Sequence, residues 1–221
     1  MKINPQPLTG DWHSGFALDL HTLSSVPKEW STKKVTVEEV VDGKRIVLEK
    51  IVEDKNKVTK WETTYTDIGL EMNHLKYWHE PHRAQALGTV AADFLKVRMS
   101  SRMIHLIVPI PPSDTTRTFQ PVYEIVNHMG RICNLPVEFG ILRKLRSTSQ
   151  LKGIVDPEER KEILKGVFSI QNGCLKNKNV LIFDDLYRSG ETIGAACRII
   201  SGVGGARCVY VLTVTKTRVK R

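Results

Sequence analysis

Residues 180–192 read VLIFDDLYRSGET. The first four residues are apolar, as in a buried strand, and the carboxyls of Asp184 and Asp185 follow side by side. A small polar turn then leads to Thr192, where we expect a helix to begin. Unpaired backbone N–H groups and the dipole at the start of that helix would form a cradle for an anion, most naturally a phosphate.

The side chains of this stretch predict binding sites for two parts of one ligand, a phosphate and a ribose. Gly190 lets the backbone approach closely, while Ser189 and Thr192 offer hydroxyl donors to a phosphate. Like charges repel, so the two aspartates need donors or a cation, and a ribose diol with a magnesium ion supplies both. Together these features describe a sugar phosphate. An acidic turn that caps a helix is the plain alternative. A nucleotide-hydrolase strand is excluded, because no G-x-x-x-x-G-K-[ST] run lies upstream.

The sequence around this stretch alternates short apolar runs with helical periodicity. Helices are predicted twice within 66–99, with a break at Pro81, and over 121–131, 157–164 and 192–200. Strands are predicted over 104–110, 136–142, 167–170, 180–183 and 208–214. This alternation predicts an α/β fold, a parallel sheet with helices on both faces, whose ligands bind at the carboxyl ends of the strands.

The first 65 residues have a different pattern. Between residues 33 and 60, charged and β-branched residues alternate on both sides of an Asp-Gly pair at 42 and 43, which indicates a β-hairpin. We therefore expect an N-terminal β-rich element over 1–65 and a core domain over 66–221.

The composition of the chain bears on its partners, its location and its metal content. The formal net charge of +9 fits a polyanionic small substrate, a nucleic acid or solubility alone. No apolar run approaches the ~20 residues that cross a bilayer, and no signal peptide is visible, so we expect a cytoplasmic protein without membrane contact. The four cysteines stand singly, without metal-ligand spacing, and predict no zinc site.

Residues 180–192 resemble the phosphoribosyl-pyrophosphate (PRPP) motif of type I phosphoribosyltransferases. The resemblance covers about residues 75–217 and is closest to the ComF-like branch, although the chain has no cysteine-rich zinc ribbon. It implies the type I phosphoribosyltransferase fold, with the N-terminal β-rich element as a hood over the strand ends. It also implies that Asp184 and Asp185 bind the ribose hydroxyls and Mg²⁺. The loop that holds the 5-phosphate would be formed by Arg188, Ser189, Gly190, Glu191 and Thr192.

Two further segments resemble the family. VPIPPS, at residues 108–113, resembles its pyrophosphate loop, and the nearby run RTFQ begins at Arg117. Prolines leave few backbone donors, so side chains or metal must meet part of the pyrophosphate charge. A basic segment after residue 142 resembles the mobile catalytic loop of relatives. A rigid proline turn and a solvated basic loop are the plain alternatives. The residues implied by these two segments are Pro111, Pro112, Ser113, Arg117, Arg143, Lys144 and Arg146.

The implied reaction is displacement of pyrophosphate from C1 of PRPP by a small-molecule nucleophile that the sequence does not name. Catalysis would come from positioning and from stabilising the leaving pyrophosphate with Mg²⁺, Arg117 and the basic loop. We also expect a homodimer. The alternative is a non-catalytic PRPP- or nucleotide-binding protein that acts in DNA uptake or regulation. A plain nucleic-acid-binding module has less support, because the basic tail KTRVKR lacks interleaved aromatic residues.

Overall fold

The chain forms two compact units in the computed structural model, which describes residues 1–41, 44–78, 80–99, 101–145 and 166–218. The main unit comprises Met1–His21 and Thr66–Arg221, and the second unit is Thr22–Tyr65. The expected division after residue 65 therefore differs from the structure for the first 21 residues. They belong to the main unit because a strand within them pairs with its last strand. That the N-terminal element forms a hood stays a prediction.

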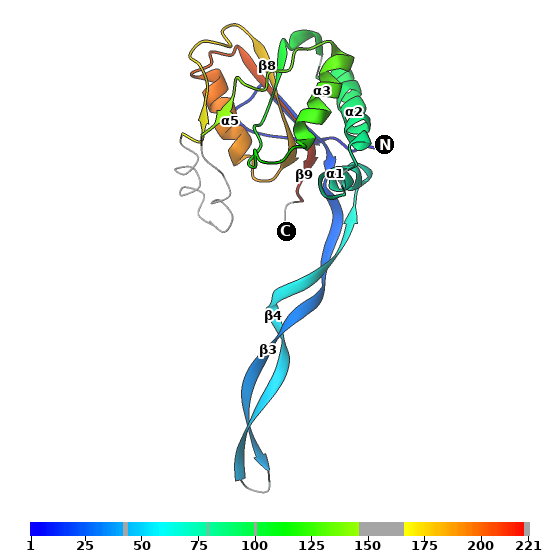
Figure 1. Cartoon of the computed structure of the whole chain (residues 1–221), viewed down its shortest axis with the longest axis vertical. Coiled ribbons are helices and arrows are strands. Elements are labelled where there is room, and N and C mark those ends of the chain that lie inside the picture. The colour runs from blue at the N-terminus through cyan, green and yellow to red at the C-terminus, as the bar shows by residue number, and fades with distance from the viewer. Residues whose placement is uncertain (42–43, 79, 100, 146–165, 219–221) are drawn as a thin grey trace. The chain divides into compact units, whose positions relative to one another are not determined.

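A central sheet lies within the main unit (Figure 1). It has five strands in the order β1-β2-β9-β8-β5. Its strands are β1 (Gln6–Pro7), β2 (Ser14–Leu20), β5 (Leu106–Pro109), β8 (Asn179–Tyr187) and β9 (Cys208–Lys216). β2, β9, β8 and β5 run parallel, and the short edge strand β1 is antiparallel to β2. The fold is thus mixed α/β with a mostly parallel central sheet, as the alternating pattern predicted.

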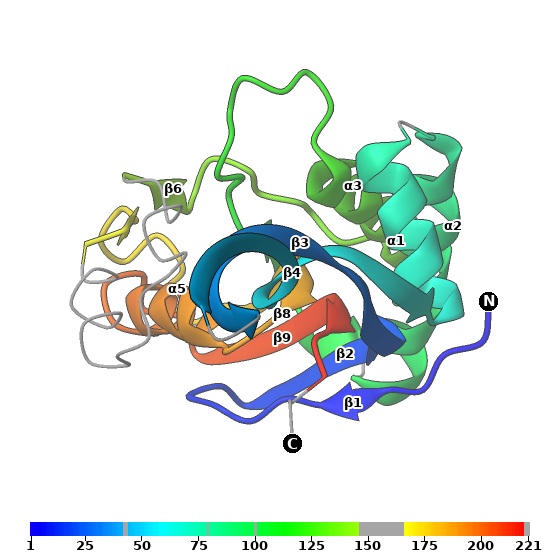
Figure 2. The same cartoon turned by 90° about the horizontal axis from the view of Figure 1, so that it is seen from below.

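Helices cover both faces of this sheet. α1 (Asp67–Tyr77), α2 (His82–Arg98) and α3 (Pro121–Cys133) lie on one face, and α5 (Glu191–Ser201) lies on the other (Figure 2). Consecutive strand residues face opposite sides, so Leu181 and Phe183 join the core under α1 to α3, whereas Val180 and Ile182 join the core under α5. This is why the apolar run that opens the stretch 180–192 is continuous. Within the described residues, no helix has the length and apolar character needed to span a membrane.

Local chemistry explains where the helices begin. The Thr66 hydroxyl accepts the backbone N–H of Gly69 at 2.9 Å and so caps α1, and α3 starts with Pro121, whose missing N–H is not needed there. Asn134 ends α3 in the left-handed conformation, with φ of 52°. The two helices predicted within 66–99 are confirmed. The predicted helix over 157–164 lies outside the described residues.

Two predicted strands do not join the central sheet as strands. The segment 136–142 makes only one parallel bridge, between Val137 and Ile107, because β5 is a short edge strand that offers few further partners. The segment 167–170 contributes β7 (Phe168–Ser169), which pairs with β6 (Arg143–Lys144) in a separate two-stranded sheet. A strand that pairs away from the main sheet has the same local pattern as one within it.

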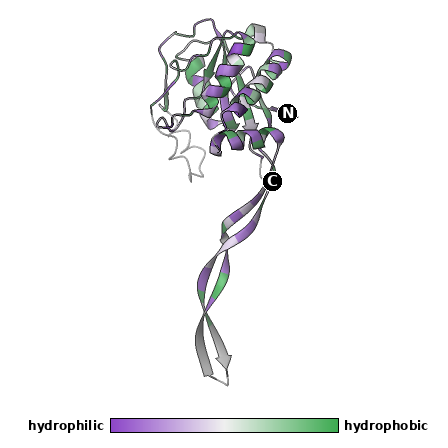
Figure 3. Ribbon diagram, turned by 45° about the vertical axis from the view of Figure 1, so that its right-hand side comes forward, coloured by the Kyte–Doolittle hydropathy of each residue, from purple (hydrophilic) through white to green (hydrophobic). Residues whose placement is uncertain are grey.

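The second unit is an antiparallel hairpin of β3 (Thr22–Val41) and β4 (Lys44–Tyr65). Val41 pairs with Lys44, so the predicted hairpin is confirmed, although its strands are much longer than the pattern suggested. The predicted turn residues 42 and 43 lie outside the described residues. Figure 3 shows hydrophilic and hydrophobic residues along both strands. Two of the ion pairs across the strands, Lys28–Glu62 at 3.4 Å and Lys60–Glu29 at 3.1 Å, are exposed and contribute little to stability.

Candidate functional site

The sheet order creates a switch point between β5 and β8. After β5 the chain passes through α3 to Val137 on the outer side of β5, whereas after β8 it passes through α5 to β9 on the other side. Neighbouring parallel strands whose connections diverge in this way leave a crevice at their carboxyl ends, where ligands bind. The proline loop, residues 110–113, follows β5 at this place, and Asp184 and Asp185 lie toward the end of β8.

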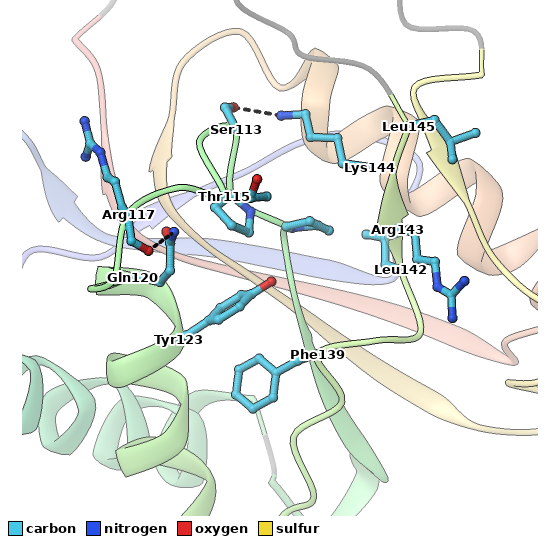
Figure 4. A pocket seen from close by; sticks show the side chains of 12 residues that line it. Ser113, Thr115, Arg117, Gln120, Tyr123, Phe139, Leu142, Arg143, Lys144 and Leu145 are labelled. Carbon is cyan, nitrogen blue, oxygen red and sulfur yellow. Dashed lines mark hydrogen bonds between the residues drawn. The ribbon is translucent and has the colours of Figure 1, made fainter.

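A cavity of about 360 Å³ occupies this crevice. Its walls include the proline loop, the two acids of β8, the start of α5 and two lysines. Polar residues in these walls include Ser113, Asp184, Asp185, Thr192, Lys76 and Lys144. A second cavity of about 500 Å³ shares the wall formed by Pro111, Pro112 and Ser113 (Figure 4). The structure therefore brings the two acids, Thr192 and the proline loop together, although they are far apart in the sequence.

The two aspartates differ in their surroundings. Asp184 is half-buried, and its Oδ1 accepts the backbone N–H of Asp185 at 2.8 Å. Burial and then the charge of Asp185 raise the pKa of Asp184 to about 8, against the opposing effect of two nearby lysines. Asp185 forms an ion pair with Lys76 of α1. The two lysines thus leave Asp184 with a raised pKa, which a bound cation would lower.

Lys144 is a basic residue that bonds directly to the proline loop. Its Nζ donates to the Ser113 hydroxyl at 2.8 Å (Figure 4). Burial lowers the pKa of Lys144, while the charge of Asp184 acts in the opposite direction. The ammonium therefore lies beside the loop, in the wall of both cavities.

Two other basic residues predicted for the site, Arg117 and Arg143, also line the cavities. Arg117 lines both cavities but pairs with Asp114 at 3.2 Å, and both side chains are at least half exposed. Arg143 lines the larger cavity, and its guanidinium points away from Ser113 (Figure 4). Arg146 lies outside the described residues.

The turn behind the acids is shorter than the sequence predicted. β8 was expected to end at residue 183, but it continues to Tyr187, so the acids lie within the strand. The reason is nonlocal, since Tyr187 pairs with Lys216 of β9 and packs edge-on against Trp12, with ring centroids 6.4 Å apart. Gly190 then begins α5 in the left-handed conformation, with φ of 81°.

The expected phosphate-binding residues are only partly in the cavity wall. Thr192 lines the 360 Å³ cavity, whereas Arg188, Ser189, Gly190 and Glu191 do not line it. The Ser189 hydroxyl donates to Glu191 Oε2 at 2.8 Å, so these side chains bond each other at the helix start. The backbone N–H groups of the first turn of α5 remain the feature of this loop suited to an anion.

Sequence analysis missed two residues near the acids, Lys76 and His21. Lys76 occupies the last turn of α1, where a basic residue favours the helix dipole and gives no signal of a site. The Thr215 hydroxyl links His21 Nδ1, at 3.2 Å, to the backbone carbonyl of Asp185, at 3.1 Å. Burial and then the charge of Lys76 lower the pKa of His21.

The acid pair has the donor chemistry of a partial magnesium site. Carboxylate oxygens suit Mg²⁺, which commonly takes one or two carboxylates and completes its shell with water and phosphate oxygens. Among the described residues, no group of three or more His, Cys, Asp or Glu side chains forms a complete protein cage. The residues present therefore fit an ion that arrives with a phosphorylated ligand.

Comparison with known proteins assigns no family. No protein-family model matches the chain, and no curated protein matches it in sequence.

Proposed function

We propose that the chain is a phosphoribosyltransferase of the type I fold, which binds Mg-PRPP and transfers its phosphoribosyl group to a nucleophile with release of pyrophosphate. The observation that carries the proposal is that the acid pair, Thr192 and the proline loop line one cavity together. The position of this cavity at the carboxyl ends of β5 and β8 supports it, because ligands of open parallel sheets bind there.

In this proposal the acid pair holds the ribose. Asp184 and Asp185 accept from the vicinal hydroxyls, which are donors matched to two adjacent carboxylates. A cation bound at the same place would lower the raised pKa of Asp184 and so favour the carboxylate form that accepts these hydroxyls. Bound Mg²⁺ supplies positive charge against the carboxylates and the phosphate oxygens.

The proline loop and Lys144 act on the leaving group. Pro111 and Pro112 fix the turn but have no N–H groups, so the Ser113 hydroxyl and the Lys144 ammonium are the nearby donors for pyrophosphate oxygens. The nucleophile forms a bond to C1 while the bond from C1 to the pyrophosphate oxygen breaks, and that oxygen keeps the electron pair. Lys144 then stabilises charge that grows as the bond breaks. Positioning of the two reactants supplies the rest of the acceleration.

The test is release of pyrophosphate from PRPP. The protein is incubated with PRPP, Mg²⁺ and a panel of nucleobases, ammonia and small amines, and pyrophosphate is quantified for each acceptor. We expect release with one class of acceptor, and none from the Asp184→Asn/Asp185→Asn double variant. Binding of PRPP by calorimetry without turnover would favour the non-catalytic alternative. Absence of PRPP binding would overturn the proposal.

A further inference from the structure

Lys76 lies inside the proposed site although it comes from a different layer of the fold. It is in the last turn of α1, and its ammonium pairs with Asp185 of β8. Both side chains are mostly shielded from solvent, with 24% of Lys76 and 21% of Asp185 exposed. They line the 360 Å³ cavity together with Asp184 and Ser113. The carboxylate that we assign to the ligand is therefore already paired in the free protein.

This pairing has a consequence for any ligand of Asp185. An ion pair that is largely removed from water is held more firmly than an exposed one, because solvent and salt screen it less. A divalent cation that reaches Asp185 carries charge of the same sign as the Lys76 ammonium. The ion and the ammonium therefore compete for one carboxylate, and the ammonium must move when the ion binds.

Lys76 has a place to move without leaving the site. It also lines an adjoining cavity of about 370 Å³, whose other walls include Tyr77, Arg117 and Phe119. The lysine stem is flexible and carries its charge as a compact point with three donors. An ammonium displaced from Asp185 thus remains within the connected cavities, where the anionic part of a phosphorylated ligand would lie.

We propose that Lys76 exchanges partners when ligand binds: it is the counter-ion of Asp185 in the free protein and a donor to the phosphate oxygens of the ligand in the complex. The proposal rests on the proposed function in one respect, that the acid pair receives a divalent cation together with a phosphorylated ligand. It adds a binding residue from α1 and makes the free protein resist Mg²⁺ alone.

The exchange predicts effects of opposite sign for Lys76→Met. Removing the competing ammonium should tighten binding of Mg²⁺ alone by about fivefold, the scale of one partly shielded ion pair. The same change removes a charge-assisted hydrogen bond to phosphate, which is worth roughly tenfold to a hundredfold. Since that loss exceeds the gain, binding of Mg-PRPP should weaken by about twofold to twentyfold. A residue that only supports the fold would not shift the two affinities in opposite directions.

The experiment is calorimetry at pH 8.5, above the pKa of Asp184, with Mg²⁺ alone and with Mg-PRPP. Lys96→Met, on the exposed side of α2, is the matched control and should change neither affinity. Lys76→Arg keeps the charge and should stay within about threefold of wild type for Mg²⁺. Circular dichroism of each variant checks that the fold is intact.

Each result has a defined meaning. Tighter Mg²⁺ binding with weaker Mg-PRPP binding in Lys76→Met supports the exchange. Unchanged or weaker Mg²⁺ binding overturns it, and so does tighter or unchanged Mg-PRPP binding. If wild type fails to bind PRPP, the proposed function is wrong, and magnesium pyrophosphate takes the place of Mg-PRPP with the same expected signs. Failure of both phosphorylated probes to bind wild type overturns the exchange as well.

Discussion

Asp184→Asn should stabilise the protein relative to wild type, and the gain should grow as the pH rises from 5 to 7. The folded-state pKa of Asp184 is raised to about 8, whereas an aspartate in an unfolded chain has a pKa of about 3.9. Between these values the folded chain holds a proton that the unfolded chain has lost, so the wild-type free energy of unfolding falls as the pH rises. Asparagine does not titrate, and its Oδ1 still accepts the backbone N–H that Asp184 accepts at 2.8 Å.

The size of the effect follows from the proton linkage. One proton contributes at most about 1.36 kcal/mol per pH unit, or about 2.7 kcal/mol between pH 5 and pH 7. Asp184 is only half-buried, and Lys76 and Lys144 oppose the shift, so we expect about 1 to 2 kcal/mol. For a chain of this size each kcal/mol corresponds to roughly 2 to 4 °C in Tm. The difference in Tm should therefore widen by about 2 to 8 °C across this interval.

The assay is thermal unfolding followed by circular dichroism at pH 5, 6 and 7, with a chelator present. Asp93→Asn, at an exposed position of α2, is the control and should leave the pH profile parallel to wild type. Added Mg²⁺ should stabilise wild type more at pH 8 than at pH 6, because the ion must displace the proton of Asp184 at the lower pH. Parallel profiles for wild type and Asp184→Asn would refute the reasoning, since they would show that this carboxyl titrates alike in the folded and unfolded chains.

Four further outcomes are expected. Asp184→Asn/Asp185→Asn should weaken Mg-PRPP binding by roughly 2 to 4 kcal/mol in calorimetry, and unchanged affinity would assign the acids to structure. Gly190→Ala should lower the free energy of unfolding, measured by denaturant titration, by about 1 to 3 kcal/mol. The reason is that φ at this position is 81° and an added Cβ would lie 2.3 Å from the Tyr187 hydroxyl. An unaltered denaturation midpoint would contradict this prediction. Arg146→Ala should lower kcat by about 10² to 10³ fold while PRPP binding changes by less than tenfold, whereas unaltered turnover would remove this residue from the mechanism. Elemental analysis should find no stoichiometric zinc, and one zinc per chain would be the contrary result.

Features that depend on neighbouring residues could be predicted from the sequence. Helical periodicity predicted α3, and an Asp-Gly pair between two alternating runs predicted the hairpin of β3 and β4. The continuous apolar run at 180–183 indicated a strand covered on both faces, because each face of a buried strand contacts a helical layer. The acid pair was recognisable for the same reason, since two adjacent carboxyls after such a strand need a partner wherever the rest of the chain lies.

Only the tertiary structure decided which segments each of these elements pairs with or packs against. β2 joins the main sheet through β9, nearly two hundred residues away, and β8 extends to Tyr187 because β9 and Trp12 provide partners for it. Lys76 looks like an ordinary basic residue at a helix end until α1 packs on the sheet and brings its ammonium to Asp185. Periodicity specifies which face of a helix or strand is buried. The residues that contact that face are set by packing between segments that are distant in the sequence. Ion pairs in a cavity form only where that packing brings opposite charges together.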